Sequence, residues 1–157
     1  MPTPVILQGT SYNLATQSDS PPWGSDQNAL IQALVTIANS TTGSSDILTT
    51  SFNLTNNQIA AANIVGLSFD TSQVRSAVIP YSIYISTATN EFSECGTIYI
   101  TYKSTANTWE LAQNYVGSSG LVFTVTPSGQ VQYTSTNVSG ASYVGKLKFK
   151  ASAFLQT

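Results

Sequence analysis

The chain has 157 residues, which suits one domain or one domain with an extension. Hydrophobic residues make up 41% of it but charged residues only 8%, so Ser, Thr, Asn and Gln must form most of the polar surface. A net charge of −2 favours a subunit that tolerates close neighbours, although Ser and Thr are also common in ordinary β proteins, and five basic residues argue against a nucleic-acid partner.

The chain contains no histidine, which excludes Ser-His-Asp and Cys-His catalysis and the usual zinc sites. It also lacks the glycine-rich phosphate-binding motifs and a calcium-loop pattern, so we predict no cofactor. No apolar run approaches the length of a membrane span, and residues 1–7 lack the features of a signal peptide. We therefore expect no membrane partner and a chain that stays in the compartment where it is made.

Residues 1–25 are predicted to form an extended arm. They hold four of the six prolines, no basic residue and a single acidic one. The Pro21-Pro22 pair favours an extended backbone. The apolar run over residues 5–7 is too small for a core but large enough to dock on another protein, and a floppy terminus is the alternative.

A helical pattern follows the arm. Ser25 suits the N-cap, and Asp26 places a negative charge in the first turn. Apolar residues then recur three and four apart and form one face: Leu30, Ile31, Leu34, Val35 and Ala38. A helix this short is marginal alone, so its apolar face needs a partner, either its own β domain or the same helix of sister chains.

Trp23, between the arm and the helix, is suited to anchor an interface because a large ring buries much area, and packing on its own domain is the alternative. The predicted interface residues are Val5, Ile6, Leu7, Trp23, Leu30, Ile31, Leu34 and Val35. Residues 41–46 (TTGSSD) form a linker. We therefore predict an anchoring arm and helix over residues 1–45 and a β domain over residues 46–157.

From about residue 47 the apolar residues alternate with the period of a strand. Between residues 76 and 86 one face is apolar: Ala77, Ile79, Tyr81, Ile83 and Ile85. Pro80 within this run indicates an edge strand or a bulge. Alternation continues over residues 95–103 and 109–115, and a Pro-Ser-Gly turn after residues 121–125 predicts a hairpin.

The last predicted strand, over residues 143–151, places Leu147 and Phe149 inward. Lys146, Lys148 and Lys150 point outward, where they would protect an edge from pairing with another chain, or form an anion-binding row. Turns at short intervals between roughly seven or eight such strands predict an all-β fold. The fold class is an antiparallel β-sandwich or jelly-roll-like domain, preceded by an extended N-terminal arm and one short α-helix.

Few residues are candidates for chemistry. Glu91 and Glu94 come closest to the carboxylate pair of a glycosidase, but a spacing of three along a strand places them on opposite faces, and we predict solvated turn charges. Cys95, the single cysteine, is predicted to be a small buried hydrophobic residue. A second resource is aromatic: five residues could form a sugar-stacking platform or belong to the core, namely Tyr81, Tyr84, Tyr99, Tyr102 and Trp109.

Three stretches carry a resemblance to a known class of proteins. They are PPWGSDQNALIQALV, FDTSQVRSAVIPYSIYISTATNEFSECGTIYITYKSTANTWEL and GQVQYTSTNVSGASYVGKLKFKA. With them the chain resembles small virion structural proteins of tailed bacteriophages over nearly its whole length. The resemblance implies a surface component of the particle, a decoration, collar or fibre-type subunit, often trimeric, with an N-terminal anchor and a distal β domain. It carries over no catalytic residue.

These observations lead to one hypothesis and two alternatives. The leading hypothesis is a non-enzymatic homotrimer in the virion, assembled in the host cytoplasm and bound to other virion proteins through residues 1–45. A fibre-tip module that binds host-surface glycan is the runner-up, and a buried Trp109 would count heavily against it. A carboxylate-based glycan hydrolase is the third, and it requires two acids close together in a cleft.

Overall fold

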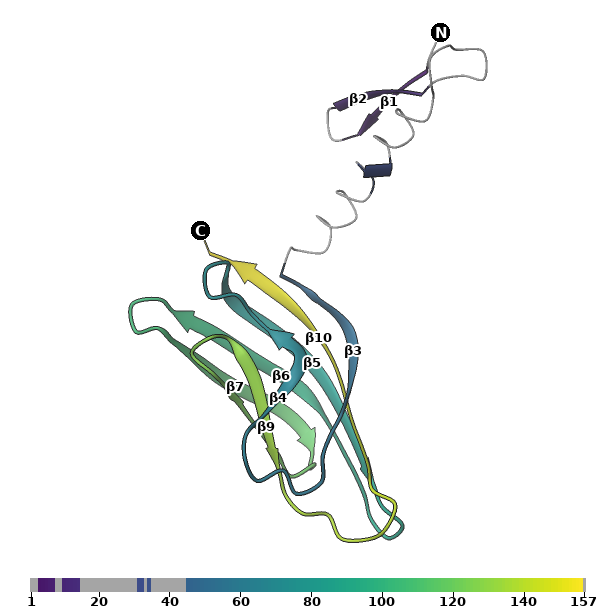
Figure 1. Ribbon diagram of the computed structural model, residues 1–157, viewed down its shortest axis with the longest axis vertical. Helices are drawn as coiled ribbons and strands as arrows, with labels where there is room; N and C mark the ends of the chain where they lie inside the picture. Colours follow the sequence, from purple (N-terminus) through teal and green to yellow (C-terminus); the bar gives the residue numbers. More distant parts are fainter. Residues whose placement is uncertain (1–2, 8–9, 15–30, 33, 35–44, 157) are drawn as a thin grey trace. The chain divides into compact units, whose positions relative to one another are not determined.

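Figure 1 presents a computed structural model of the chain, which describes residues 3–7, 10–14, 31–32, 34 and 45–156. The chain divides into two compact units, Met1–Ser44 and Ser45–Thr157, and each is described by itself. Within the described residues, no helix has the length and apolar character needed to cross a membrane.

In the first unit, strands β1 (Thr3–Leu7) and β2 (Thr10–Leu14) pair in antiparallel register, with Val5 opposite Tyr12. The sequence predicts an extended arm here, whereas these two segments are folded against each other. The physical reason lies in composition, because both segments contain β-branched residues and the second contains Tyr12, and such residues favour strands.

The predicted helix is represented by three described residues. Ile31, Gln32 and Leu34 are helical, within the segment where the apolar spacing predicts a helix. The side chain of Ile31 is 57% exposed and that of Leu34 is 49% exposed. Lying outside the described residues are Trp23, Leu30, Val35 and the predicted N-cap Ser25.

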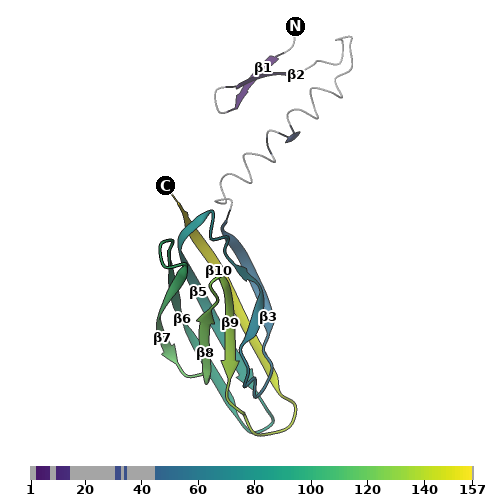
Figure 2. The ribbon, with the colours of Figure 1, turned by 60° about the vertical axis from the view of Figure 1, so that its left-hand side comes forward.

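The second unit consists of two antiparallel sheets. The five-stranded sheet has the order β3 (Ile47–Asn53), β10 (Val144–Leu155), β5 (Val74–Ser86), β6 (Glu91–Lys103) and β7 (Thr108–Gly117). The three-stranded sheet has the order β4 (Ala62–Ser68), β9 (Gln130–Ser135) and β8 (Leu121–Val125). Figures 1 and 2 show β8 and β9 lying over the long strands of the larger sheet. The predicted fold class, an antiparallel all-β sandwich, is confirmed.

The core lies between the two sheets and is supplied by the alternating apolar residues of both. All five residues that the sequence places on one face of β5 are buried: Ala77, Ile79, Tyr81, Ile83 and Ile85. Rings also meet across the gap between the sheets, with Tyr81 and Phe123 at 5.3 Å between centroids and Phe52 and Tyr133 at 5.7 Å. Each large side chain buried here contributes about 1.5–3 kcal/mol to folding.

The predicted hairpin between residues 121 and 133 is confirmed as β8 and β9, with Phe123 opposite Tyr133. The pairing of β9 with β4 is irregular, because the register shifts between Asn63 and Ser68. The amide of Gln130 stabilises this bulge, since its Nε2 lies 3.0 Å from the carbonyl oxygen of Ile64 and 3.1 Å from that of Leu67.

Pro80 does not mark an edge, because β5 lies between β10 and β6. Of the two alternatives predicted for Pro80, an edge strand or a bulge, the edge strand is therefore wrong. Pro80 pairs with Thr97 of β6, while the register with β10 passes from Tyr81 opposite Phe149 to Val78 opposite Ser152. β10 is itself irregular toward β3 between Phe149 and Ala151. The missing N–H of Pro80 thus falls at a local interruption of the ladder inside the sheet.

The alternation predicted for β10 is confirmed, because Leu147 and Phe149 are buried whereas Lys146, Lys148 and Lys150 are exposed. Edge protection, the first of the two roles predicted for these lysines, is wrong, since β10 is an interior strand flanked by β3 and β5. An interior strand has both of its hydrogen-bonding edges occupied, so it needs no protection from pairing with another chain.

Candidate interaction surface

Glu94 is buried in the second unit, and the prediction of a solvated turn charge is wrong for it. It lies within β6 with 5% of its surface exposed, whereas Glu91 at the start of the same strand is exposed. Tyr81 Oη donates to Glu94 Oε1 at 2.7 Å, and Gln113 Nε2 lies 3.3 Å from the same oxygen. The backbone N–H and the hydroxyl of Ser119 donate to Oε2 at 2.9 and 2.8 Å.

This cluster joins three strands of the larger sheet to the loop between β7 and β8. Burial, together with the hydrogen bond to Glu94, raises the pKa of the Tyr81 hydroxyl, so Tyr81 stays protonated as a donor to the carboxylate. All four contacts use the carboxylate as an acceptor, and the group is shielded from solvent. The arrangement stabilises the sandwich, and its signal in the sequence is that Glu94 shares the strand parity of the buried residue Ile98.

Three further described acids are also engaged in local contacts. Asp46 accepts a hydrogen bond from the backbone of Ala153, and Glu110 forms an ion pair with Lys103. The hydroxyl and backbone N–H of Ser72 donate to Asp70, and these bonds lower the pKa of that carboxyl. Among the described residues, no group of three or more His, Cys, Asp or Glu side chains could hold a metal ion.

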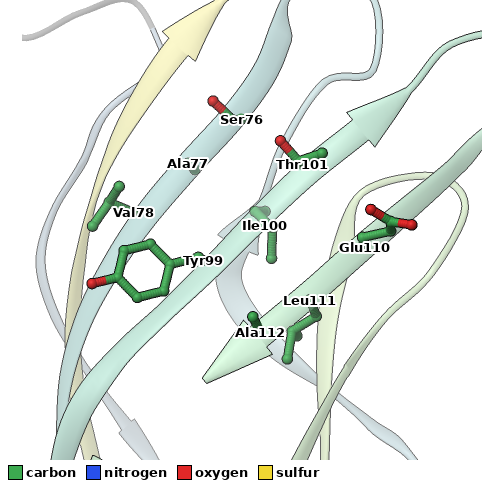
Figure 3. Close-up of a pocket in the computed structure, with 9 residues that line it drawn as sticks. All are labelled: Ser76, Ala77, Val78, Tyr99, Ile100, Thr101, Glu110, Leu111 and Ala112. Atoms are coloured by element: carbon green, nitrogen blue, oxygen red, sulfur yellow. The ribbon is translucent and has the colours of Figure 1, made fainter. Parts of the chain in front are cut away.

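The outward side of the five-stranded sheet, here called the outer face, carries an open groove of about 630 Å³. Its floor follows one row of cross-strand neighbours, with Val78 of β5 opposite Tyr99 of β6 and Tyr99 opposite Ala112 of β7. Figure 3 shows these side chains on adjacent strands, with Thr101 and Glu110 farther along the groove. The groove therefore combines an aromatic ring that is 47% exposed with a hydroxyl and a carboxylate.

The aromatic residues do not form one platform. Tyr81, Tyr102 and Trp109 are buried, as in the core alternative, whereas Tyr84 and Tyr99 are exposed on the outer face. Trp109 is only 8% exposed and packs on Tyr102, with 5.0 Å between ring centroids. A sugar-stacking role for Trp109 is therefore excluded in this conformation. This finding counts against the predicted fibre-tip module that binds host-surface glycan.

Cys95 is exposed, so the prediction of a buried hydrophobic residue is wrong. It lies on the outer face between Ser82 of β5 and Val116 of β7. The physical reason is strand parity, because Cys95 alternates with the buried positions of β6 and shares its face with Tyr99.

The predicted interface residues belong to the first unit. Val5, Ile6 and Leu7 lie on β1, and Ile31 and Leu34 are exposed helical residues. The other three, Trp23, Leu30 and Val35, fall outside the described residues. Their role as an interface stays a prediction.

No protein-family model matches the chain, and no curated protein matches it. Among solved structures it is similar to the tailspike protein of Acinetobacter phage vB_ApiP_P1, with a TM-score of 0.43 and 12% identity over 68% of this chain and 22% of that one. It is also similar to the tailspike protein of Acinetobacter baumannii phage AM24, with a TM-score of 0.35 and 12% identity over 71% of this chain and 26% of that one. This chain thus spans about a quarter of the length of either protein. Likenesses with TM-scores below 0.5 do not establish a common fold.

Proposed function

We propose that the chain is a non-enzymatic structural subunit of a tailed-bacteriophage virion, of the decoration or fibre type. Residues 1–45 hold it to the particle, and the sandwich over residues 46–157 faces outward. Its resemblance in sequence to small virion structural proteins supports this proposal, together with its low charge.

The observation that carries the proposal is the exposure of two apolar side chains on the helix of the first unit. Ile31 and Leu34 lie three residues apart, on one helical face, and each leaves about half of its surface in solvent. A short helix and a two-stranded hairpin are each marginal in water, so the unit that contains them gains stability by burying this face. Other polypeptides, including sister copies of the helix, supply the surface that is required.

The first test measures oligomeric mass by light scattering. We expect the full chain to give three times its mass of 16.6 kDa, and a chain that begins at residue 46 to give a monomer. In the full chain, Ile31→Glu combined with Leu34→Glu should also give a monomer. The matched control is Leu48→Glu, which changes an exposed leucine of the sandwich and should leave the trimer intact. A monomeric full chain would contradict self-association.

The second test is incorporation into particles. A chain that lacks residues 1–45 should be absent from purified virions, whereas the Leu48→Glu variant should be present at normal occupancy. Full occupancy of the truncated chain would contradict anchoring. In a separate assay, the purified full chain should release no new reducing ends from host polysaccharide, and such release would contradict the non-enzymatic role.

A second candidate function is glycan recognition, which the groove at Tyr99 favours. An exposed tyrosine ring flanked by the Thr101 hydroxyl and the Glu110 carboxylate suits one face of a sugar and its hydroxyl groups. Binding to an array of neutral glycans should then be lost in Tyr99→Ala and kept in Tyr84→Ala, which removes an exposed tyrosine outside the groove. An array without hits, or equal binding by both variants, would exclude this candidate.

A further inference from the structure

We propose that Lys146, Lys148 and Lys150, here called the lysine strip, bind a linear acidic polysaccharide. This site is separate from the anchoring unit and does not depend on the structural role proposed above. It lies on the outer face, along β10, where Lys146 and Lys148 stand opposite Tyr84 and Ser82 of β5.

The geometry of the strip suits a repeating polyanion. The three lysines occupy alternate positions of one strand, so their stems emerge about 7 Å apart and the strip extends over about 14 Å. Because β10 is an interior strand, the row stands within the sheet's outer face and is open to a long ligand. An interior strand needs no protection of its edge, so of the two roles predicted for these lysines the anion-binding row is the one that stays open.

The charge of the strip is not balanced by its neighbours in the sheet. Lys146 lies between Asn53 of β3 and Tyr84 of β5, and Lys148 lies between Ser51 and Ser82. Within residues 45–156, the lysine that does form an ion pair is Lys103, with Glu110. Neighbouring lysines of the strip, about 7 Å apart, fall within one Debye length of each other, so a bound anion relieves their repulsion.

The side chains around the strip favour a saccharide as the carrier of the negative charge. A shallow groove runs beside Lys148 and Lys150 and is lined by Thr49, Pro80 and Ser82. Thr49, Ser51 and Ser82 offer short hydroxyl groups, which hydrogen-bond to sugar hydroxyls, while the side-chain oxygen of Asn53 accepts a hydrogen bond from Lys146. Lysine supplies point charges for carboxylates. The arginine of the flanking strand β5, Arg75, lies at the other end of that strand from Ser82 and Tyr84 and donates to the backbone carbonyl of Tyr102, so no arginine fork for phosphate stands beside the strip.

Calorimetry or interferometry with the full chain tests the proposal, with an oligogalacturonate of defined length as the probe. We expect binding at about 50 mM salt that weakens strongly at about 500 mM, because exposed charge pairs are screened. Replacement of all three lysines by glutamine should lower the affinity about tenfold or more, since each exposed pair contributes modestly. The matched control is Lys103→Gln, which removes a lysine of β6, a strand separated from β10 by β5, and should leave the affinity within about twofold.

Two further probes separate a polysaccharide site from general attraction. A neutral dextran oligomer should not bind, and single-stranded DNA should bind more weakly than the oligogalacturonate. The proposal is overturned if the wild-type chain does not bind oligogalacturonate at low salt, if the triple glutamine variant binds as well as wild type, or if DNA binds equally well. All three lysines are exposed, and circular dichroism of each variant checks that the sandwich is intact.

Discussion

The hydroxyl of Tyr81 donates a 2.7 Å hydrogen bond to the carboxylate of Glu94, on the next strand of the sheet and within the core. A buried charge is costly unless polar partners surround it, and here Ser119 and Gln113 complete the set of donors. The contact couples the strands β5, β6 and β7 to the loop that leads into the second sheet. Its effects on stability can be measured directly.

Replacement of Glu94 by leucine should lower the free energy of unfolding by about 3 kcal/mol, because it leaves the Ser119 N–H buried without an acceptor. Glu94→Gln should cost about 1 kcal/mol, since the amide keeps one acceptor but turns its NH₂ toward other donors. Chemical denaturation measures both values. Glu91→Gln, at an exposed position of the same strand, should change stability by less than about 0.5 kcal/mol. A loss in Glu91→Gln as large as that in Glu94→Leu would contradict a specific role of the buried cluster.

The raised pKa of Tyr81 predicts a loss of stability at alkaline pH. Below about pH 10 the tyrosine is protonated in the folded and the unfolded chain, so its contribution is present in full. Above about pH 10 the unfolded chain releases the proton while the folded chain retains it, and the free energy of unfolding therefore falls as the pH rises. Unfolding curves between about pH 8 and pH 11 should show a weaker decline for Tyr81→Phe than for wild type.

The Tyr81→Phe variant should also be less stable at neutral pH, by about 1–2 kcal/mol, because Glu94 loses a donor. Some alkaline decline should remain in this variant, since burial also raises the pKa of Tyr143. Tyr84→Phe, at an exposed position of β5, is the control for loss of a phenol. Equal pH dependence in wild type and Tyr81→Phe would show that Tyr81 does not carry the effect.

Gln130 is a second position where we expect substitution to lower stability strongly, because its amide holds the bulge of β4. Its Nε2 lies within 3.1 Å of the carbonyl oxygens of Ile64, Leu67 and Val131. Gln130→Glu directs a carboxylate at these oxygens, and we expect a loss of about 2–3 kcal/mol in denaturant unfolding. Gln132→Glu, next on the same face of β9, affects one exposed bond to Asn63 and should cost less than about 1 kcal/mol. Equal losses would contradict the role of the Gln130 amide in the bulge.

The sequence predicted the inward and outward faces of the long strands, because strand alternation is a local property. It held for Ile83 on β5 and for Leu147 and Lys148 on β10. Which strands are neighbours depends on pairing between distant segments, and no local pattern contains that information. The prediction of an edge therefore failed at Pro80 and at the lysine strip, since both strands are interior.

The wrong predictions at Glu94 and Cys95 have a different cause. They follow the usual exposure of each residue type, whereas strand parity decides the burial of both side chains. Acids are mostly exposed and cysteines mostly buried, yet Glu94 shares the parity of Ile98 and Cys95 that of Tyr99. The same parity separates the buried Tyr102 from the exposed tyrosine of the groove. The candidate surfaces could thus be predicted by face, but their assembly into a groove or a strip required the order of the strands.

The last prediction compares Gly129, in the turn between β8 and β9, with Gly66, in β4, because the two glycines have nearly the same backbone conformation. Gly129 has φ +84° and Gly66 has φ +83°, so alanine pays a similar conformational cost at either position, about 1–2 kcal/mol. A Cβ at Gly129 would lie 2.0 Å from the carbonyl oxygen of Phe69, whereas at Gly66 the nearest atom, in Thr50, is 4.0 Å away. Gly129 also accepts a hydrogen bond from the N–H of Phe69, so the two backbones cannot separate without losing it. We expect Gly66→Ala to lower the midpoint of thermal unfolding modestly and Gly129→Ala to lower it much further. In free energy of unfolding, the loss in Gly129→Ala should exceed that in Gly66→Ala by at least about 2 kcal/mol. Equal losses would show that the turn can move away from β4, and that the close contact with Phe69 does not hold the two ends of the smaller sheet together.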